Sequence, residues 1–305
     1  MKRCIPGVVV FSAFLLVLAG CAQGKTPTAA VAVPPTAVAT IASGDTERSL
    51  TIEGIDRSYF LHIPPGLTSD QPLPLVLVFH GFSGTGDSMA ITTGFNKLAD
   101  AYGFLVVYPN GTGPVGATSW NAEGCCGYAT DNSVDESTFV QTIISDLKAE
   151  ADIDPKRIYA TGFSNGAMLA YRLGCDMSDT LAAVAPVAGV LLHNPCQPAQ
   201  PVSVLHIHGM ADLSVPYAGR TTPAVMGIFE SVQQSISTWV ELDGCPAAPL
   251  VEQNGIVTHN SYAPCSNGTA VELYSLQGIG HTWPPDAILP ASQIIWNFFV
   301  AHPKI

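Results

Sequence analysis

One stretch of the sequence, residues 160–167 (Ala-Thr-Gly-Phe-Ser-Asn-Gly-Ala), constrains the fold more than any other. The residues before it favour a short buried strand, and the residues after it favour a helix. In so tight a strand-to-helix turn, Ser164 is held in strained backbone geometry with its hydroxyl exposed. Side chains at Gly162 and Gly166 would collide where strand and helix cross. The motif therefore predicts a nucleophilic serine, and the alternative is a glycine-flanked surface turn.

Composition limits the classes of function. The 305 residues are 47% hydrophobic and 12% charged, which is ample for one large core. The net charge is −12. Nucleic acid is therefore not an expected partner, because binding it requires a basic patch. We expect a monomer that needs no cofactor.

Predicted strands alternate with predicted helices along most of the chain. An antiparallel hairpin is expected at 48–63, and apolar runs bounded by Pro or Gly predict buried strands further on. These strands are expected at 73–81, 104–109, 157–160, 181–189, 203–209 and 271–276, and helices at 91–102, 135–151, 167–171 and 291–301. The alternation predicts a single α/β domain with a doubly wound, mainly parallel sheet in three layers. Its ligand site should lie at the carboxyl ends of the strands.

The N-terminus resembles an export signal. Residues 1–20 combine a basic start with an apolar segment of signal-peptide length, and they end at Cys21 in a sequence that resembles a bacterial lipobox. We expect a lipid on Cys21 to anchor the protein to a membrane surface, the alternative being an ordinary signal peptide and secretion. Residues 21–47 are rich in Ala, Pro and Thr and predict a disordered tether. The folded domain is expected at 48–305.

The cysteines fit an exported protein. Of eight cysteines, Cys4 lies in the predicted signal and Cys21 in the lipobox, so six remain for disulfides. Short loops favour a Cys175–Cys196 pair and a Cys245–Cys265 pair. That leaves the adjacent Cys125 and Cys126 as free thiols or as a vicinal bridge. No metal site is expected, because no Cys-x-x-Cys pair or matching His spacing occurs.

A serine nucleophile requires a base, and the base requires a carboxylate. His281 lies on a glycine-rich loop directly after the last predicted strand, which is where a histidine could reach Ser164. Asp212 is the acid placed directly after the predicted strand at 203–209. The runner-up, Asp243, sits beside Gly244 and fits a turn better. The expected triad is Ser164, Asp212 and His281, in the chain order of this kind of fold.

An oxyanion hole requires two backbone donors. The N–H of Asn165, at the start of the helix after Ser164, is one candidate. The N–H of Phe82, in the loop after the strand at 73–81, is the other. His80 is expected to be structural. His206 and His208 share one face of a strand, but no third ligand is evident, so packing is favoured over a metal.

Several motifs together resemble the esterase/polyhydroxybutyrate-depolymerase family of the α/β-hydrolase superfamily. They lie at 80–81, 120–127, 162–166, 208–217 and 280–284, and they include Trp120-Asn121, Cys125-Cys126-Gly127 and Gly280-His281-Thr282-Trp283-Pro284. The resemblance covers about residues 48–300. It implies the triad Ser164, Asp212 and His281, but not the substrate, because family members cleave polyester, feruloyl-sugar or acetyl-sugar esters.

The expected activity is ester hydrolysis through an acyl-enzyme. A feruloyl esterase acting on plant cell-wall carbohydrate esters is the first expectation, and a polyhydroxybutyrate depolymerase is the second. A surface binding protein on an inactive hydrolase fold is the alternative from another class. Trp120, Trp283 and Phe82 are expected to line the substrate site as an aromatic wall, although simple core packing would also explain them.

Overall fold

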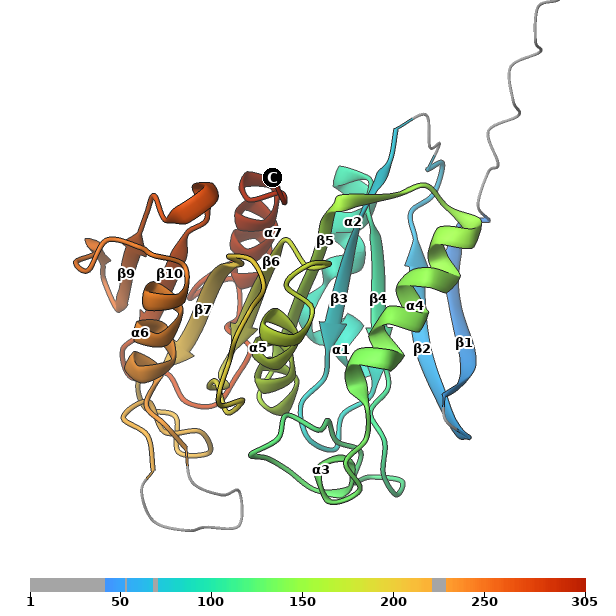
Figure 1. Cartoon of the computed structure of the whole chain (residues 1–305), viewed down its shortest axis with the longest axis horizontal. Coiled ribbons are helices and arrows are strands. Elements are labelled where there is room, and N and C mark those ends of the chain that lie inside the picture. Colours follow the sequence, from blue (N-terminus) through green and yellow to red (C-terminus); the bar gives the residue numbers. More distant parts are fainter. Residues whose placement is uncertain (1–41, 53, 68–70, 221–228) are drawn as a thin grey trace, which may run out of the picture. The chain divides into compact units, whose positions relative to one another are not determined.

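The computed structural model describes residues 42–52, 54–67, 71–220 and 229–305, which belong to one compact unit. Its centre is a ten-stranded sheet with the order β1-β2-β4-β3-β5-β6-β7-β10-β9-β8 (Figure 1). The six strands in the middle are parallel to one another. They are β3 (Leu73–Phe79), β4 (Leu105–Pro109), β5 (Ile153–Phe163), β6 (Ala183–Val187), β7 (Ser203–Gly209) and β10 (Val271–Leu276). This is the doubly wound α/β architecture that the sequence predicts.

Antiparallel hairpins extend the sheet at both edges. They are formed by β1 (Gly44–Ile52) with β2 (Ile55–Ile63), and by β8 (Leu250–Asn254) with β9 (Val257–Tyr262). Strand β1 therefore begins at Gly44, before the expected start of the hairpin at residue 48. The strand was missed there because β1 is an edge strand whose first residues are exposed, so its composition resembles that of a linker.

Helices cover both faces of the sheet and create two cores (Figure 1). One face carries α4 (Glu136–Glu150), α5 (Asn165–Asp176) and α6 (Val232–Leu242), and the other carries α1 (Gly86–Thr93), α2 (Phe95–Tyr102) and α7 (Ala291–Ala301). Strand β3 serves both cores, because Leu75 and Leu77 pack in the first and Val76 and Val78 in the second. Its unbroken apolar run reflects burial on both faces.

The predicted helix at 91–102 is in fact the end of one helix followed by a second. Gly94 adopts a left-handed conformation (φ 64°) between α1 and α2, and its N–H donates to the carbonyl of Ala90. Helix α1 begins earlier than expected, after the N-cap residue Thr85. Two short elements complete the structure: α3 (Tyr128–Asp131) and a 3₁₀ turn at Ser266–Gly268.

Three disulfides are present in the described residues. They join Cys175 with Cys196, Cys245 with Cys265, and the adjacent Cys125 with Cys126. The first two are the pairs that the loop lengths favour, and disulfides of this kind are typical of exported proteins. The predicted signal segment, Cys21 and the tether up to residue 41 lie outside the described residues. Within the described part, no helix is both long and apolar enough to span a bilayer.

Candidate active site

The Gly-x-Ser-x-Gly stretch forms a sharp elbow between β5 and α5. Strand β5 ends at Phe163 and α5 begins at Asn165, so Ser164 alone makes the turn, with φ 56° and ψ −120°. A Cβ atom on Gly162 would lie 2.5 Å from the carbonyl oxygen of Gly166. A Cβ atom on Gly166 would collide with carbonyl oxygens at the end of β3. Only glycine therefore fits at either position. Ser164 is held with a positive φ, which residues other than glycine rarely adopt.

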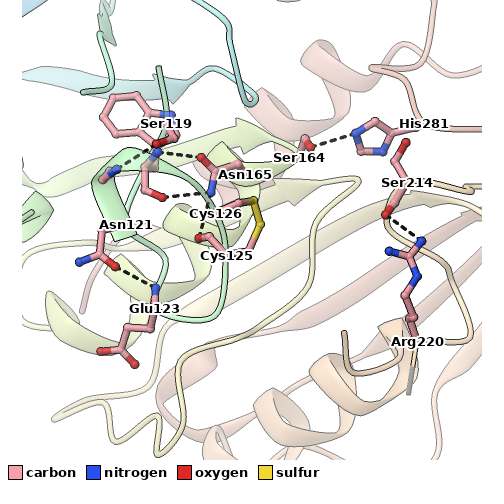
Figure 2. The surroundings of a disulfide bond; sticks show 12 residues. Ser119, Asn121, Glu123, Cys125, Cys126, Ser164, Asn165, Ser214, Arg220 and His281 are labelled. Atoms are coloured by element: carbon pink, nitrogen blue, oxygen red, sulfur yellow. Dashed lines mark hydrogen bonds between the residues drawn. A yellow bond between two sulfur atoms is a disulfide. The ribbon is translucent and has the colours of Figure 1, made fainter. Parts of the chain in front are cut away.

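Three side chains from distant parts of the chain meet at this elbow. The Oγ of Ser164 lies 2.9 Å from Nε2 of His281, and Nδ1 of His281 lies 2.7 Å from Oδ2 of Asp212. Asp212 follows β7 and His281 follows β10, so all three stand at the carboxyl edge of the parallel sheet. Figure 2 shows the hydrogen bond between Ser164 and His281. The geometry is that of a serine, a base and a carboxylate in series.

The carboxylate of Asp212 is buried but well supplied with donors. Its Oδ1 accepts the backbone N–H groups of Ser214 and Val215, both at 2.8 Å. Its Oδ2 faces His281, and Nε2 of His208 lies 3.3 Å away. Burial raises the pKa of the Asp212 carboxyl, but the hydrogen bonds from His208, His281 and Val215 outweigh burial and hold that pKa well below its usual range. Asp212 is therefore an ionised partner for an imidazole.

The two expected oxyanion donors belong to segments that adjoin Ser164, namely the start of α5 and the loop after β3. Asn165 is the first residue of α5, so its N–H is not used inside the helix. The loop after β3 passes close to the elbow, because a Cβ atom on Gly81 would lie 3.3 Å from Cβ of Ser164. Among the described residues, neither the N–H of Asn165 nor that of Phe82 donates to another group. Both amides are thus available to a ligand.

His80 has a structural role, as expected. Its ring is buried, Nδ1 donates to the carbonyl of Gly81 at 2.7 Å, and Nε2 accepts the N–H of Gly111 at 2.9 Å. Burial lowers the pKa of His80 to about 4. Both ring nitrogens are occupied, so this histidine holds the loop after β4 against the end of β3.

The two tryptophans are used mainly in core packing. Trp120 is fully buried, its Nε1–H donates to the carbonyl of His80 at 2.8 Å, and its ring packs edge-on against Phe79. Trp283 is 7% exposed and belongs to the core on the other face of the sheet, where its Nε1–H donates to Oγ of Ser292. Full burial contradicts the lining role predicted for Trp120, whereas that role stays a prediction for Trp283, which borders a surface pocket together with Thr93 and Pro284. The role of Phe82, which is 41% exposed, also stays a prediction.

Sequence reasoning missed a second use of Asn165. Its buried side chain accepts the N–H of Trp120 at 2.7 Å and donates to the carbonyls of Trp120 and Cys125, at 3.1 and 3.2 Å. Figure 2 shows these bonds with the Cys125–Cys126 disulfide beside them. The residue after the nucleophile therefore fixes the loop at 120–126 to the elbow. In the sequence, the one indication of this contact was that the motifs at 120–127 and 162–166 both belong to the pattern of the same family.

Comparison with known proteins agrees with this geometry. Residues 57–218 match the family described as "Esterase PHB depolymerase". The chain belongs to this family. It is 32% identical to feruloyl esterase B of Piromyces equi over 74% of this chain and 42% of that protein. It is 33% identical to the putative esterase NocK of Nocardia uniformis subsp. tsuyamanensis, over 78% of this chain and 74% of that one.

The family assignment extends to the fold. Among solved structures, an acetyl xylan esterase from Aspergillus awamori superposes with a TM-score of 0.62 at 16% identity, covering 84% of this chain and 99% of that one. At this level of identity the likeness shows the fold alone. The chain spans less than half the length of the Piromyces equi relative.

Proposed function

We propose that this member of the esterase family is a serine carboxylic-ester hydrolase that works through an acyl-enzyme. The observation that carries the proposal is the continuous contact from Ser164 through His281 to Asp212, at 2.9 and 2.7 Å. A serine hydroxyl becomes nucleophilic when a neighbouring base removes its proton, and a carboxylate fixes and stabilises that base. The low pKa of the Asp212 carboxyl supports the same assignment.

The mechanism follows from these positions. Oγ of Ser164 attacks the ester carbonyl while Nε2 of His281 takes the hydroxyl proton. The carbonyl oxygen becomes an oxyanion, which the N–H groups of Phe82 and Asn165 bind. His281 then gives its proton to the leaving alcohol, and the acyl group remains on Ser164. In the second half, His281 takes a proton from water as its oxygen attacks the acyl-enzyme. The bond between the acyl carbon and Oγ then breaks, His281 returns the proton to Oγ of Ser164, and the acid is released.

The direct test is Ser164→Ala, assayed on a soluble ester such as a p-nitrophenyl ester. Loss of the nucleophile should lower kcat on the order of 10³-fold or more with the fold intact. Ser145→Ala, on the exposed side of α4, is the matched control and should hydrolyse the ester like the wild type. A fluorophosphonate probe should label the wild type and the control but not Ser164→Ala. Full activity of Ser164→Ala, or a wild type inert to probe and esters, would reject the proposal.

For the substrate, a feruloyl-type carbohydrate ester is our first choice and a polyhydroxybutyrate segment is the second. The feruloyl esterase among the relatives supports the first. The half-exposed ring of Phe82 and the exposed Leu213, next to Asp212, offer apolar surface to an acyl group of either kind. Rates on methyl ferulate, acetylated xylan and a hydroxybutyrate oligomer would decide. Preference for the oligomer would favour the polyester, and turnover of acetylated xylan alone would reject both.

Cell-surface anchoring is a separate proposal. The disulfides support export, and the sequence before Cys21 supports lipidation. Cys21→Ala should move the protein from the membrane fraction to the medium without loss of esterase activity. A wild type found only in the medium would reject the anchor.

A further inference from the structure

A line of three buried polar side chains leads away from Asp212 into the core. The hydroxyl of Tyr171, in α5, lies 2.6 Å from Nδ1 of His206 in β7. Nε2 of His206 lies 2.9 Å from Nδ1 of His208, two residues further along the same strand. Tyr171 and His206 are fully buried and His208 is 1% exposed. The mechanism uses none of these groups, so the reason for placing them in an apolar core is open.

The last contact of the line fixes the hydrogen on His208. Its Nε2 lies 2.9 Å from the backbone carbonyl of Val215. A carbonyl can only accept, so Nε2 of His208 carries a hydrogen. Oδ2 of Asp212 lies 3.3 Å from the same Nε2, close enough to share this hydrogen as a second, longer contact. His208 therefore presents its hydrogen to the Asp212 carboxylate and to the loop that carries Asp212 and Val215.

The other hydrogens of the line follow from this one. We assign the single hydrogen of the His208 ring to Nε2, so Nδ1 of His208 accepts and Nε2 of His206 donates to it. Nδ1 of His206 then accepts the hydroxyl hydrogen of Tyr171. Burial, assisted by the neighbouring His208, lowers the pKa of His206 well below its usual range. Every donor thus points toward Asp212, an arrangement in which successive hydrogen bonds polarise one another.

We infer that His208, supported by His206 and Tyr171, is a positioning residue that holds the carboxylate of Asp212 in line with His281. The inference rests on the proposed function. The two backbone donors, from Ser214 and Val215, hold Oδ1 only. Besides His281, His208 is the described side chain that lies next to Oδ2, and this second contact restrains the rotation of the carboxylate.

Few other ionisable groups face His208. His206 adjoins it on β7, and Asp212 lies on the loop that follows. The ring of Tyr217 packs edge-on against the His208 ring, with 5.8 Å between the ring centroids. The Tyr217 hydroxyl forms a hydrogen bond of 2.7 Å with Oγ of Ser275 on β10. His281 lies beyond Asp212. The Nε2–H of His208 therefore has two acceptors among the described side chains and backbone, Val215 and Asp212.

The test compares His208→Gln with His208→Asn. The amide of Gln reaches the position of Nε2 and can still donate, whereas the shorter amide of Asn cannot. His208→Asn should lower kcat on the order of tenfold with KM unchanged, because one bond to a charged group is lost. Its acid limb of kcat/KM should move to higher pH, since a carboxylate with fewer donors favours the protonated, inactive form of the His281–Asp212 pair. His208→Gln should keep kcat within about threefold of the wild type.

Equal losses in the two variants, or an unmoved pH profile in His208→Asn, would overturn the inference, while an inert wild type would instead reject the proposed function. If His208→Asn fails to fold, Tyr171→Phe supplies the comparison, because it removes one oxygen at the far end of the line. It should move the acid limb in the same direction by a smaller step, and an unmoved limb would overturn the inference.

Imidazole ¹⁵N NMR of the wild-type protein gives an answer independent of activity. His206 and His208 should both appear protonated at Nε2 and not at Nδ1. A ring protonated at Nδ1 in either residue would contradict the direction of the line and with it the inference.

Discussion

Asp212 and Asp243 are both buried, yet the protein treats their carboxyl groups in opposite ways. The carboxylate of Asp212 has donors on both oxygens. Asp243 receives one N–H, from Val202 at 3.2 Å, and its Oδ2 has no partner among the described residues. Burial raises the pKa of the Asp243 carboxyl to about 7, against the weaker opposite effect of the Val202 bond. The number of hydrogen bonds that each carboxyl group accepts, and not burial alone, therefore decides whether its pKa is lowered, as in Asp212, or raised, as in Asp243.

This contrast predicts a pH-dependent stability. The Asp243 carboxyl keeps its proton up to about pH 7 in the folded protein and loses it near pH 4 in the unfolded chain. The folded state binds more protons in this window, so the contribution of Asp243 to stability falls as pH rises through it. Asp243→Asn, which cannot ionise, should gain on the order of 1–3 kcal/mol relative to the wild type between pH 5 and pH 8.

Thermal unfolding across that range checks the prediction, with Asp286→Asn on the exposed surface as the control. The control and the wild type should give parallel curves of Tm against pH. An Asp243→Asn curve that also runs parallel to the wild type would show that the Asp243 carboxyl ionises normally.

Residue-level reasoning predicted that Ser164, Asp212 and His281 meet, as the structure has them. Each lies at or shortly after the end of a strand, and the ends of parallel strands meet at one edge of the sheet. The same reasoning failed for Trp120, whose surroundings depend on segments far away in the sequence. An aromatic residue near a motif can pack inward or outward with the same local sequence, so its burial could not be predicted.

At the scale of elements, β2 is tied to α4 by a buried ion pair. Arg57 donates to Glu136 at 2.9 Å, with the two side chains 2% and 0% exposed. Glu136 also accepts the N–H of Asn121 at 3.1 Å, and the Arg57 guanidinium stacks over the ring of Phe139. Burial raises the pKa of the Glu136 carboxyl, and Arg57 opposes that rise. The pair therefore holds an edge hairpin, a helix and the loop that carries Trp120.

Breaking this pair on one side should cost more than neutralising both partners. Arg57→Met leaves an unpaired buried carboxylate and should destabilise the fold on the order of 3–5 kcal/mol. Arg57→Met with Glu136→Gln keeps the acceptor for Asn121 without the charge, and it should be the more stable of the two. Denaturant unfolding measures both, and a double variant less stable than Arg57→Met would contradict the prediction. Arg48→Met, at the more exposed contact with Glu150, is the control and should change stability by about 1 kcal/mol or less.

Several elements with an apolar period were predicted well, but α6 was missed although Val232, Ile236 and Trp239 recur at helical spacing. The buried strands and α4 and α7 follow their apolar patterns. The hairpin of β8 and β9 lacks such a pattern, because β8 is wholly exposed. The break at Gly94 is invisible to periodicity, since a left-handed cap interrupts the path of the backbone while apolar residues continue on both sides.

At the scale of the molecule, sheet order brings the site together. Ser164 and His281 are 117 residues apart in the chain, and Asp212 and His281 are 69 apart. Strand β6 alone separates β5 from β7, and β10 pairs directly with β7 (Figure 1). The order of the parallel strands β5, β6, β7 and β10, and not closeness along the chain, therefore brings the three residues together. The site requires that the C-terminal half of the sheet stays intact.

The two long-range disulfides brace this C-terminal half. Cys175–Cys196 ties the end of α5 to the loop after β6, and Cys245–Cys265 ties the segment after α6 to the segment after β9. They close loops of similar length, with sequence separations of 21 and 20. A disulfide stabilises the fold by restricting the unfolded chain, and this effect depends on the length of the loop that it closes. Replacing either pair of cysteines by alanine should therefore lower the free energy of unfolding by a similar amount, about 3 kcal/mol.

Denaturant unfolding of Cys175→Ala with Cys196→Ala, and of Cys245→Ala with Cys265→Ala, measures the two costs directly. Loss of both disulfides should cost close to the sum, because the pairs bridge separate segments. The Cys125–Cys126 pair joins neighbours and closes almost no loop, so the same entropic argument assigns its removal no comparable loss. Two long-range variants with very different losses would mean that native-state packing around the sulfurs, and not loop closure, sets their contribution to stability.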